Sequence, residues 1–297
     1  MPQLALGTAQ FGLRYGITNA EGKVAPALAC TLLKQANEAG VAFIDTAQAY
    51  GNAEQVLGES LPSCHSFRVI SKLPAQPADQ PFDAATELRW QRSLELTLER
   101  LKLVQIDGLL LHAASDLARP DGSRLLDWMR TVQQRGQVRR IGVSIYGAAD
   151  LEGLPLNELQ LVQIPCSLYD QRLLDDGTIN TLRSYGIAVH ARSLYLQGLL
   201  VTPPERWSEV IAPALRHHHE KLQSWAQCNG WSLVQLALTW ARRQAWMEAA
   251  VVGVTSETEL DQLCGAWCGP DPWQDQQPES WAWPLGSDLD PRQWAER

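Results

Sequence analysis

Short apolar runs alternate with longer amphipathic stretches along most of the chain. Residues 83–101 carry leucines at helical spacing, and residues 125–135 form a second amphipathic segment. The strand-like runs read QLALGTA, VAFIDT, FRVISK, IDGLLLH, VRRIGVS, LQLVQIP, GIAVHARS and AAVVGV. Glycines stand where helices commonly end, at Gly40, Gly136, Gly186 and Gly230. Eight strands alternating with helices over about 250 residues predict an α/β fold of the (β/α)8 TIM-barrel class.

A doubly wound open sheet is the main competing fold. Such a sheet usually carries a glycine-rich phosphate-binding turn directly after its first strand. The corresponding turn here reads GTAQFG, which lacks the G-x-G-x-x-G spacing. The barrel is therefore favoured.

The last thirty residues break the alternating pattern. We assign residues 1–268 to the barrel and residues 269–297 to a tail rich in proline, aspartate and tryptophan. The tail tryptophans, too apolar to be left in water, are Trp273, Trp281, Trp283 and Trp294. We expect the tail to pack on the barrel, over a core end or over the substrate mouth.

Composition narrows the class of protein. The chain has 297 residues, of which 45% are hydrophobic, so it can bury a full core. Its formal net charge of −8 argues against nucleic acid and anionic membrane surfaces as partners. Neither a signal peptide nor a run of about 20 apolar residues is found. We expect a cytoplasmic protein with a small-molecule substrate, and the sequence makes no prediction of its oligomeric state.

Polar side chains end three neighbouring strand runs. Asp45 ends the second run, Lys72 the third and His112 the fourth, and Tyr50 follows on the loop after Asp45. In a barrel of this class the carboxyl ends of the strands face the reaction pocket. The sequence therefore predicts that these four side chains meet at one rim. Each residue alone could have a structural role, as a helix cap or a solvated strand end. Four suitable residue types that follow one another at consecutive strand ends favour a functional site instead.

The residue types of this set suit proton transfer to a carbonyl oxygen. An ammonium beside a phenol favours loss of the phenolic proton, and a carboxylate keeps a buried ammonium charged. In this interpretation Tyr50 donates the proton, and the Lys72–Asp45 pair makes its phenol more acidic. His112 orients the substrate oxygen. Because no side chain supplies hydride, a nicotinamide cofactor is implied.

Motifs throughout the chain carry a family resemblance. The segments LGTAQFG, FIDTAQAYG, VISKL, LLLHAASD, RSLYLQGLL, LVQLALTWA and VVGVTSETEL resemble, in this order, those of the aldo-keto reductase family. The resemblance implies an NAD(P)H-dependent aldo-keto reductase-like oxidoreductase on residues 1–268, with Tyr50 as general acid. It implies that an aldehyde, ketone or sugar carbonyl is reduced to the alcohol, or the reverse.

The same resemblance implies a cofactor site without a Rossmann domain. Arg192 takes the place of the aromatic residue that commonly stacks on the nicotinamide, and its planar guanidinium could stack instead. The cofactor-binding residues implied are Ser144, Gln163, Arg192, Ser193, Leu194, Gln197, Gly198, Gly253, Thr255 and Ser256. The asparagine usual after the serine is Ile145 here.

Cofactor preference is less clear from the sequence. Residues 253–268 contain no basic side chain for a 2′-phosphate, although Arg242, Arg243 or a residue from elsewhere could reach it. We expect NADP(H), with NAD(H) as a rival. Gln10, Phe11 and the tail tryptophans are expected among the residues that line the substrate pocket.

Two other functions remain open. One is a cofactor-binding redox-sensing or regulatory subunit with little turnover, which the intact set of four residues argues against. The other is a metal-dependent barrel isomerase or lyase, which would need carboxylate and imidazole ligands at several strand ends. Only Asp45 and His112 fit that need, so we expect no metal.

Overall fold

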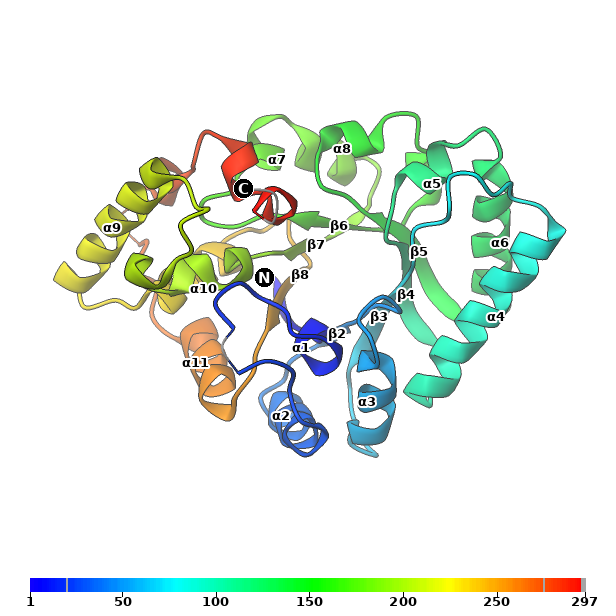
Figure 1. Cartoon of the computed structure of the whole chain (residues 1–297), viewed down its shortest axis with the longest axis horizontal. Helices are drawn as coiled ribbons and strands as arrows, with labels where there is room; N and C mark the ends of the chain where they lie inside the picture. Colours follow the sequence, from blue (N-terminus) through cyan, green and yellow to red (C-terminus); the bar gives the residue numbers. More distant parts are fainter. Residues whose placement is uncertain (20, 275, 295–297) are drawn as a thin grey trace.

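Eight parallel strands form one closed barrel in chain order (Figure 1). The computed structural model describes residues 1–19, 21–274 and 276–294. The strands are β1 Gln3–Gly7, β2 Phe43–Asp45, β3 Arg68–Leu73, β4 Ile106–Leu111, β5 Val138–Ser144, β6 Leu161–Pro165, β7 Ala188–Arg192 and β8 Ala249–Gly253. Seven of the eight apolar runs recognised in the sequence contain one of these strands, and β3 extends one residue past its run, so the expected barrel is confirmed.

Helices cover the outside of the barrel. They are α1 Ala9–Gly12, α2 Pro26–Glu38, α3 Ala53–Ser60, α4 Ala84–Leu101, α5 Ser115–Ala118, α6 Gly122–Gln134, α7 Arg172–Asp175, α8 Thr178–Ser184, α9 Pro213–Cys228, α10 Leu233–Arg242 and α11 Glu257–Cys268. The expected helix at 83–101 is α4, whose first turn is capped by the Asp83 side chain accepting from Thr86 N. No helix among the described residues combines the length and apolar character needed to cross a bilayer.

Several connections use short 3-10 turns. They are η1 Ala148–Leu151, η2 Leu156–Glu158, η3 Leu196–Val201, η4 Pro204–Arg206, η5 Pro278–Trp281, η6 Gly286–Leu289 and η7 Pro291–Gln293. Between β5 and β6 the chain makes only η1 and η2, where the regular alternation would place a helix. The four glycines expected after helices all have positive φ, between 71° and 77°.

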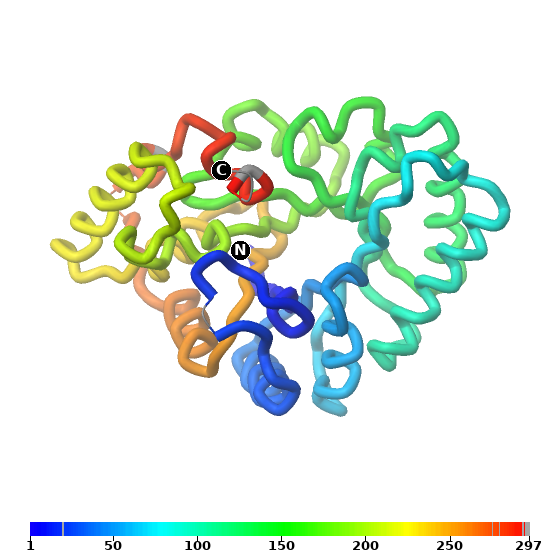
Figure 2. Tube along the Cα trace, in the orientation of Figure 1, coloured from blue at the N-terminus to red at the C-terminus, as the bar shows by residue number. Residues whose placement is uncertain are grey.

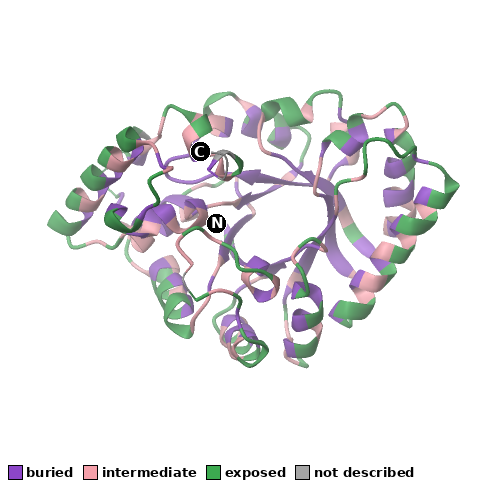
Figure 3. Ribbon diagram, viewed as in Figure 1, coloured by how far each residue is buried: buried purple, intermediate pink, exposed green. Residues whose placement is uncertain are grey.

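Two apolar cores hold the fold together. A small core fills the barrel, made by Ala5, Phe43, Ile70, Leu110, Leu161, Ala249 and Val251. Gly108 belongs to this packing, because a Cβ there would lie 2.7 Å from Ile70 Cδ1. A much larger core lies between the strands and the helices. Figure 3 shows this as buried strands and inner helix faces, with exposed outer helix faces.

Charged side chains close the amino end of the barrel. Glu248 accepts from Arg140 at 2.7 Å and contacts His190 Nε2 at 2.7 Å, and Arg140 also pairs with Asp107. Burial by itself raises the pKa of Glu248, but the bonds from His190 and Arg140 lower it, to about 2. The barrel floor is thus an ion-paired layer, at the opposite end from the strand ends that carry Asp45 and Arg192.

The tail follows the outside of the barrel from one end toward the other. Trp273 is fully buried, stacks on Trp225 with ring centres 5.4 Å apart, and donates to Leu236 O. Further along, Trp283 N donates to Tyr169 O, beyond the end of β6. Figure 2 shows the tail running past α9 before its last turn reaches the strand ends. The described part of the tail is therefore attached at both barrel ends.

Candidate active site

An ion pair lies at the carboxyl ends of β2 and β3. Lys72 Nζ donates to both oxygens of Asp45, at 2.8 and 2.9 Å, and to Thr46 O at 3.0 Å. The two side chains are only 1% and 5% exposed. Burial by itself lowers the pKa of Lys72, but Asp45 and Tyr50 raise it, and its net pKa lies above the usual value. The amine is therefore held as an ammonium.

Tyr50 lies beside this ion pair on the loop between β2 and α3. The Lys72 ammonium is 5.3 Å from the centre of the Tyr50 ring. The loop is fixed by close packing, since a Cβ on Gly12 would lie 1.6 Å from Tyr50 O. Two turn hydrogen bonds, from Tyr50 N to Ala47 O and from Ala53 N to Tyr50 O, hold it further. The phenol is thus placed near a permanent positive charge.

His112 follows β4 and lies against the same phenol. Its ring centre is 6.2 Å from that of Tyr50, with the planes at 84°. Burial, together with the positive charges of Lys72 and Arg192, lowers the pKa of His112 to about 4. The imidazole is neutral at pH 7 and can donate a single N–H hydrogen bond. The structure therefore brings all four predicted catalytic residues together.

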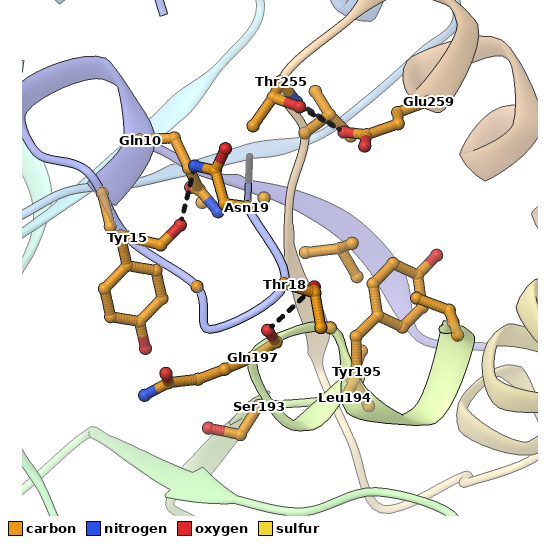
Figure 4. Close-up of a pocket in the computed structure, with 18 of the residues that line it drawn as sticks. Gln10, Tyr15, Thr18, Asn19, Ser193, Leu194, Tyr195, Gln197, Thr255 and Glu259 are labelled. Carbon is orange, nitrogen blue, oxygen red and sulfur yellow. Dashed lines mark hydrogen bonds between the residues drawn. The ribbon is translucent and has the colours of Figure 1, made fainter. Parts of the chain in front are cut away.

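A cavity of about 420 Å³ extends from this centre along the barrel mouth. Asp45 and Tyr50 lie at its wall, together with seven of the ten predicted cofactor residues: Arg192, Ser193, Leu194, Gln197, Gly198, Gly253 and Thr255. Ser144, Gln163 and Ser256 are outside this lining. Figure 4 shows how the loops after β1, β7 and β8 meet around the cavity.

Gln163 connects the ion pair to β6. Its Nε2 donates to Asp45 Oδ2 at 2.6 Å, so the amide orientation is fixed. Its Oε1 is buried and has no hydrogen-bond partner within the described structure. Ser144 pairs with Gln163 in the parallel register of β5 and β6. A buried acceptor without a donor is costly, and it favours a ligand that supplies an N–H at this point.

The loop after β7 has an unusual backbone. Ser193, Leu196 and Gln197 have φ of 63°, 48° and 55°, in the left-handed region that non-glycine residues rarely adopt. The loop also contacts the loop after β1, because Thr18 Oγ1 donates to Gln197 O at 3.4 Å (Figure 4). Backbone strain of this kind persists where the surrounding structure requires it, and it is commonly found at ligand sites.

The start of α11 forms the other end of the cavity. Glu259 Oε2 accepts from Thr255 N at 2.6 Å and from Thr255 Oγ1 at 3.0 Å. Ser256 caps the helix, its hydroxyl accepting from Glu259 N. A carboxylate therefore accepts from both donors of Thr255, directly before the helix cap.

The two arginines considered for a 2′-phosphate bind the tail instead. Arg242 donates to Gly269 O, and Arg243 donates to Asp271 and to Trp273 O. Neither lines the cavity. Besides Arg192, Arg206 lines the cavity, at the end of η4.

Sequence reasoning missed several residues of the cavity wall. Tyr15, Arg206 and Glu259 line it, and no strand-end rule points to them because they lie on long loops or on a helix surface. Gln10 lines the cavity as expected. The expectation for Phe11 is wrong, because α1 directs this side chain into the core, where it is fully buried.

A second cavity of about 230 Å³ adjoins the first at Arg192 and Ser193. Its walls come from the ends of β5, β6 and β7 and from the tail segment Leu289 to Arg292. None of the four tail tryptophans lines either cavity within the described structure, so the tail reaches the mouth through other side chains. Within the same residues, no cluster of three histidine, cysteine or carboxylate side chains suits a metal ion.

A model of the Aldo/keto reductase family matches residues 3–271. The chain belongs to this family. A 6-dehydroglucose reductase of Novosphingobium aromaticivorans is 29% identical over 240 residues, covering 74% of each chain. An aldo-keto reductase of Mycobacterium tuberculosis is 30% identical over 227 residues, covering 65% of this chain and 72% of its own.

Solved structures of the family share the fold. Aldo-keto reductase AKR11C1 of Bacillus halodurans, in its holo form, superposes with a TM-score of 0.76 at 18% identity, covering 94% of this chain and 92% of its own. An aldo/keto reductase of Klebsiella pneumoniae in complex with NADP and acetate gives 0.66 at 20% identity, with 91% and 87% covered. The expected family and the expected class of enzyme, an oxidoreductase, are thereby confirmed.

Proposed function

We propose that this oxidoreductase reduces the carbonyl group of an aldehyde, ketone or sugar to the alcohol, or runs the reverse reaction, with a nicotinamide cofactor. The observation that carries the proposal is the buried Lys72–Asp45 pair beside Tyr50, at the wall of a cavity large enough for a ligand. The name of the Novosphingobium relative supports a sugar-like substrate. The proposal includes a cytoplasmic location and a small-molecule substrate.

In the direction of reduction, Tyr50 donates its phenolic proton to the carbonyl oxygen as that oxygen gains negative charge. The Lys72 ammonium stabilises the phenolate that remains, and solvent restores the proton afterwards. Neutral His112 donates an N–H hydrogen bond to the same oxygen and fixes its orientation. A nicotinamide cofactor, when bound, would supply the hydride for the carbonyl carbon. For alcohol oxidation Tyr50 acts as the base.

The residues present fit a nicotinamide cofactor. Gln163 has a buried acceptor without a partner, which suits the carboxamide N–H₂, and Ser144 lies next to it in the register. The remaining predicted residues lie along the cavity or at the start of α11: Arg192, Ser193, Leu194, Gln197, Gly198, Gly253, Thr255 and Ser256. In the proposal they would hold the ring and the phosphates of the cofactor.

We propose NADP(H) as the cofactor, with NAD(H) as the rival. Arg206 brings a positive charge to the cavity that Thr255 also lines, and the Klebsiella relative is described with NADP. Glu259 at the helix start supports the rival, because its carboxylate repels a 2′-phosphate and suits a ribose hydroxyl. Comparing the dissociation constants for NADPH and NADH, by quenching of protein fluorescence, decides between them.

The test of the activity is the variant Tyr50→Phe. We expect it to bind the reduced cofactor as the wild type does and to lose about 10²–10⁴-fold in turnover of aldehydes, because only the proton donor is removed. Tyr185→Phe removes an exposed phenol on the outer surface and is the matched control. Unchanged turnover in Tyr50→Phe contradicts the mechanism. Tight cofactor binding by the wild type without consumption on a broad carbonyl panel contradicts the enzyme proposal and favours a regulatory subunit.

A further inference from the structure

Arg192 on β7 lies two residues nearer to the carboxyl end of the barrel than His190, the residue that pairs with Gln163 on β6. Gln163 and Pro165 are two residues apart on β6, so their side chains point to the same face. Pro165 pairs with Arg192 in the parallel register of β6 and β7. Gln163 carries the unpartnered acceptor that suits the carboxamide. A nicotinamide ring whose carboxamide is held there would therefore lie next to Arg192.

The guanidinium of Arg192 is held in one place. Its NH2 donates to Ile145 O at 3.1 Å, and its NH1 donates to Ser193 Oγ at 3.3 Å. Its central carbon lies 4.4 Å from the centre of the Tyr146 ring. Arg292 from the tail also packs on Tyr146, at 3.7 Å. These contacts fix a planar cation where the two cavities meet.

The charge of Arg192 differs from those of the neighbouring arginines because no carboxylate among the described residues forms an ion pair with it. Arg292 forms a bidentate pair with Asp290, at 2.9 and 2.6 Å. Arg172 is paired with Asp170 in the same way, at 2.8 and 2.9 Å. Within the part of the chain that the structure describes, no carboxylate lies within 4.0 Å of the Arg192 guanidinium nitrogens.

The ion pair and the imidazole near Arg192 contribute no net charge. Lys72 and Asp45 are ion-paired, so their charges cancel. His112 is neutral, with its pKa lowered to about 4. Asp150, which lines the second cavity together with Arg192, accepts from Tyr146 N and Gly147 N. Among Asp45, Lys72, His112 and Arg192, only Arg192 therefore carries a charge that the set itself does not balance.

We propose that Arg192 makes this site bind the reduced nicotinamide cofactor more tightly than the oxidised one, so that the free enzyme is loaded with the reduced form. The inference rests on the proposed function. The oxidised ring carries a positive charge that the reduced ring lacks, and both forms share the same phosphates and adenosine. Arg192 therefore repels only the oxidised form. After reduction of the substrate the same repulsion speeds release of the oxidised cofactor.

The experiment compares dissociation constants for the two redox forms of one cofactor, measured by calorimetry in wild type and three variants. Arg192→Met removes the charge and keeps the length. Arg192→Lys keeps the charge. Arg292→Met is the matched control. It removes the other guanidinium that packs on Tyr146, and the charge of that guanidinium is already paired with Asp290. The ratio of the two constants is taken within each variant, so a general loss of affinity cancels.

We expect Arg192→Met to lower the ratio of oxidised to reduced dissociation constants by about tenfold or more, since two unit charges about 5 Å apart interact strongly at partly buried sites. Arg192→Lys and Arg292→Met should keep the wild-type ratio within about threefold. An unchanged ratio in Arg192→Met, with both forms still bound, overturns the inference alone. Absence of binding of either form to the wild type overturns the proposed function and the inference with it.

Discussion

Mutating either partner of the buried Lys72–Asp45 pair should lower the free energy of unfolding, and the loss should differ between the two partners. In Asp45→Asn the ammonium of Lys72, whose side chain is 1% exposed, loses its counterion but stays buried. Breaking a buried pair by removing one partner costs about 3–5 kcal/mol of unfolding free energy. In Lys72→Met the remaining carboxylate keeps its bond from Gln163 Nε2 at 2.6 Å, so we expect a loss near the lower end of that range.

The double variant separates stability from catalysis. Asp45→Asn combined with Lys72→Met leaves no charge in the site, so its stability should return to within about 1–2 kcal/mol of the wild type. Its turnover should stay as low as that of Lys72→Met, because the phenolate of Tyr50 has lost its cation. Turnover near that of the wild type would refute the role given to Lys72.

The assay is urea unfolding at pH 7 and 15 °C, followed by tryptophan fluorescence, with turnover measured on the same samples. The pH dependence of the unfolding free energy provides a second test of the ion pair. The folded pKa of Lys72 lies above its ordinary value, so its stabilisation is present below about pH 10.4 and is lost as the pH rises through the folded pKa. The double variant should lack this alkaline loss. A coupling energy below about 1 kcal/mol between the two sites would contradict the buried pair.

Two further predictions concern the floor and the loops. Glu248→Gln should lower the free energy of unfolding by roughly 2–3 kcal/mol at pH 7, because the charge-assisted hydrogen bonds to Arg140 and His190 are weakened. The folded pKa of Glu248 is about 2, so its stabilisation is present above pH 4.5 and is lost as pH falls toward 2; the cost measured by urea unfolding should shrink at pH 3. Gly198→Ala should weaken cofactor binding by about tenfold or more, because φ is 102° and the new Cβ would lie 1.8 Å from Thr18 Oγ1. Calorimetry checks this, and unchanged affinity would contradict a role for the contact between the two loops.

The strand ends could be placed from the sequence because chain order fixes strand order in this barrel. Asp45, Lys72 and His112 end or follow consecutive strands, so their meeting required no knowledge of the loops. The apolar runs were equally informative, since strands in such a barrel are buried on both sides.

The rest of the site depends on contacts that sequence spacing does not encode. The bond between Glu259 and Thr255 depends on how the strand end turns into α11. The place of Arg206 depends on how the long segment between β7 and α9 folds back. Phe11 was misplaced because the short helix α1 after β1 has too few residues to show which face is apolar. The missing helix between β5 and β6 likewise left no periodic signal to detect.

The path of the tail makes part of the site wall replaceable without touching the barrel. Residues Leu289 to Arg292 line the second cavity, which adjoins the first at Arg192 and Ser193. Substitutions in this stretch would therefore reshape the second cavity while every strand stays as it is. Differences in this short segment could change which molecules are accepted by chains that share the same barrel.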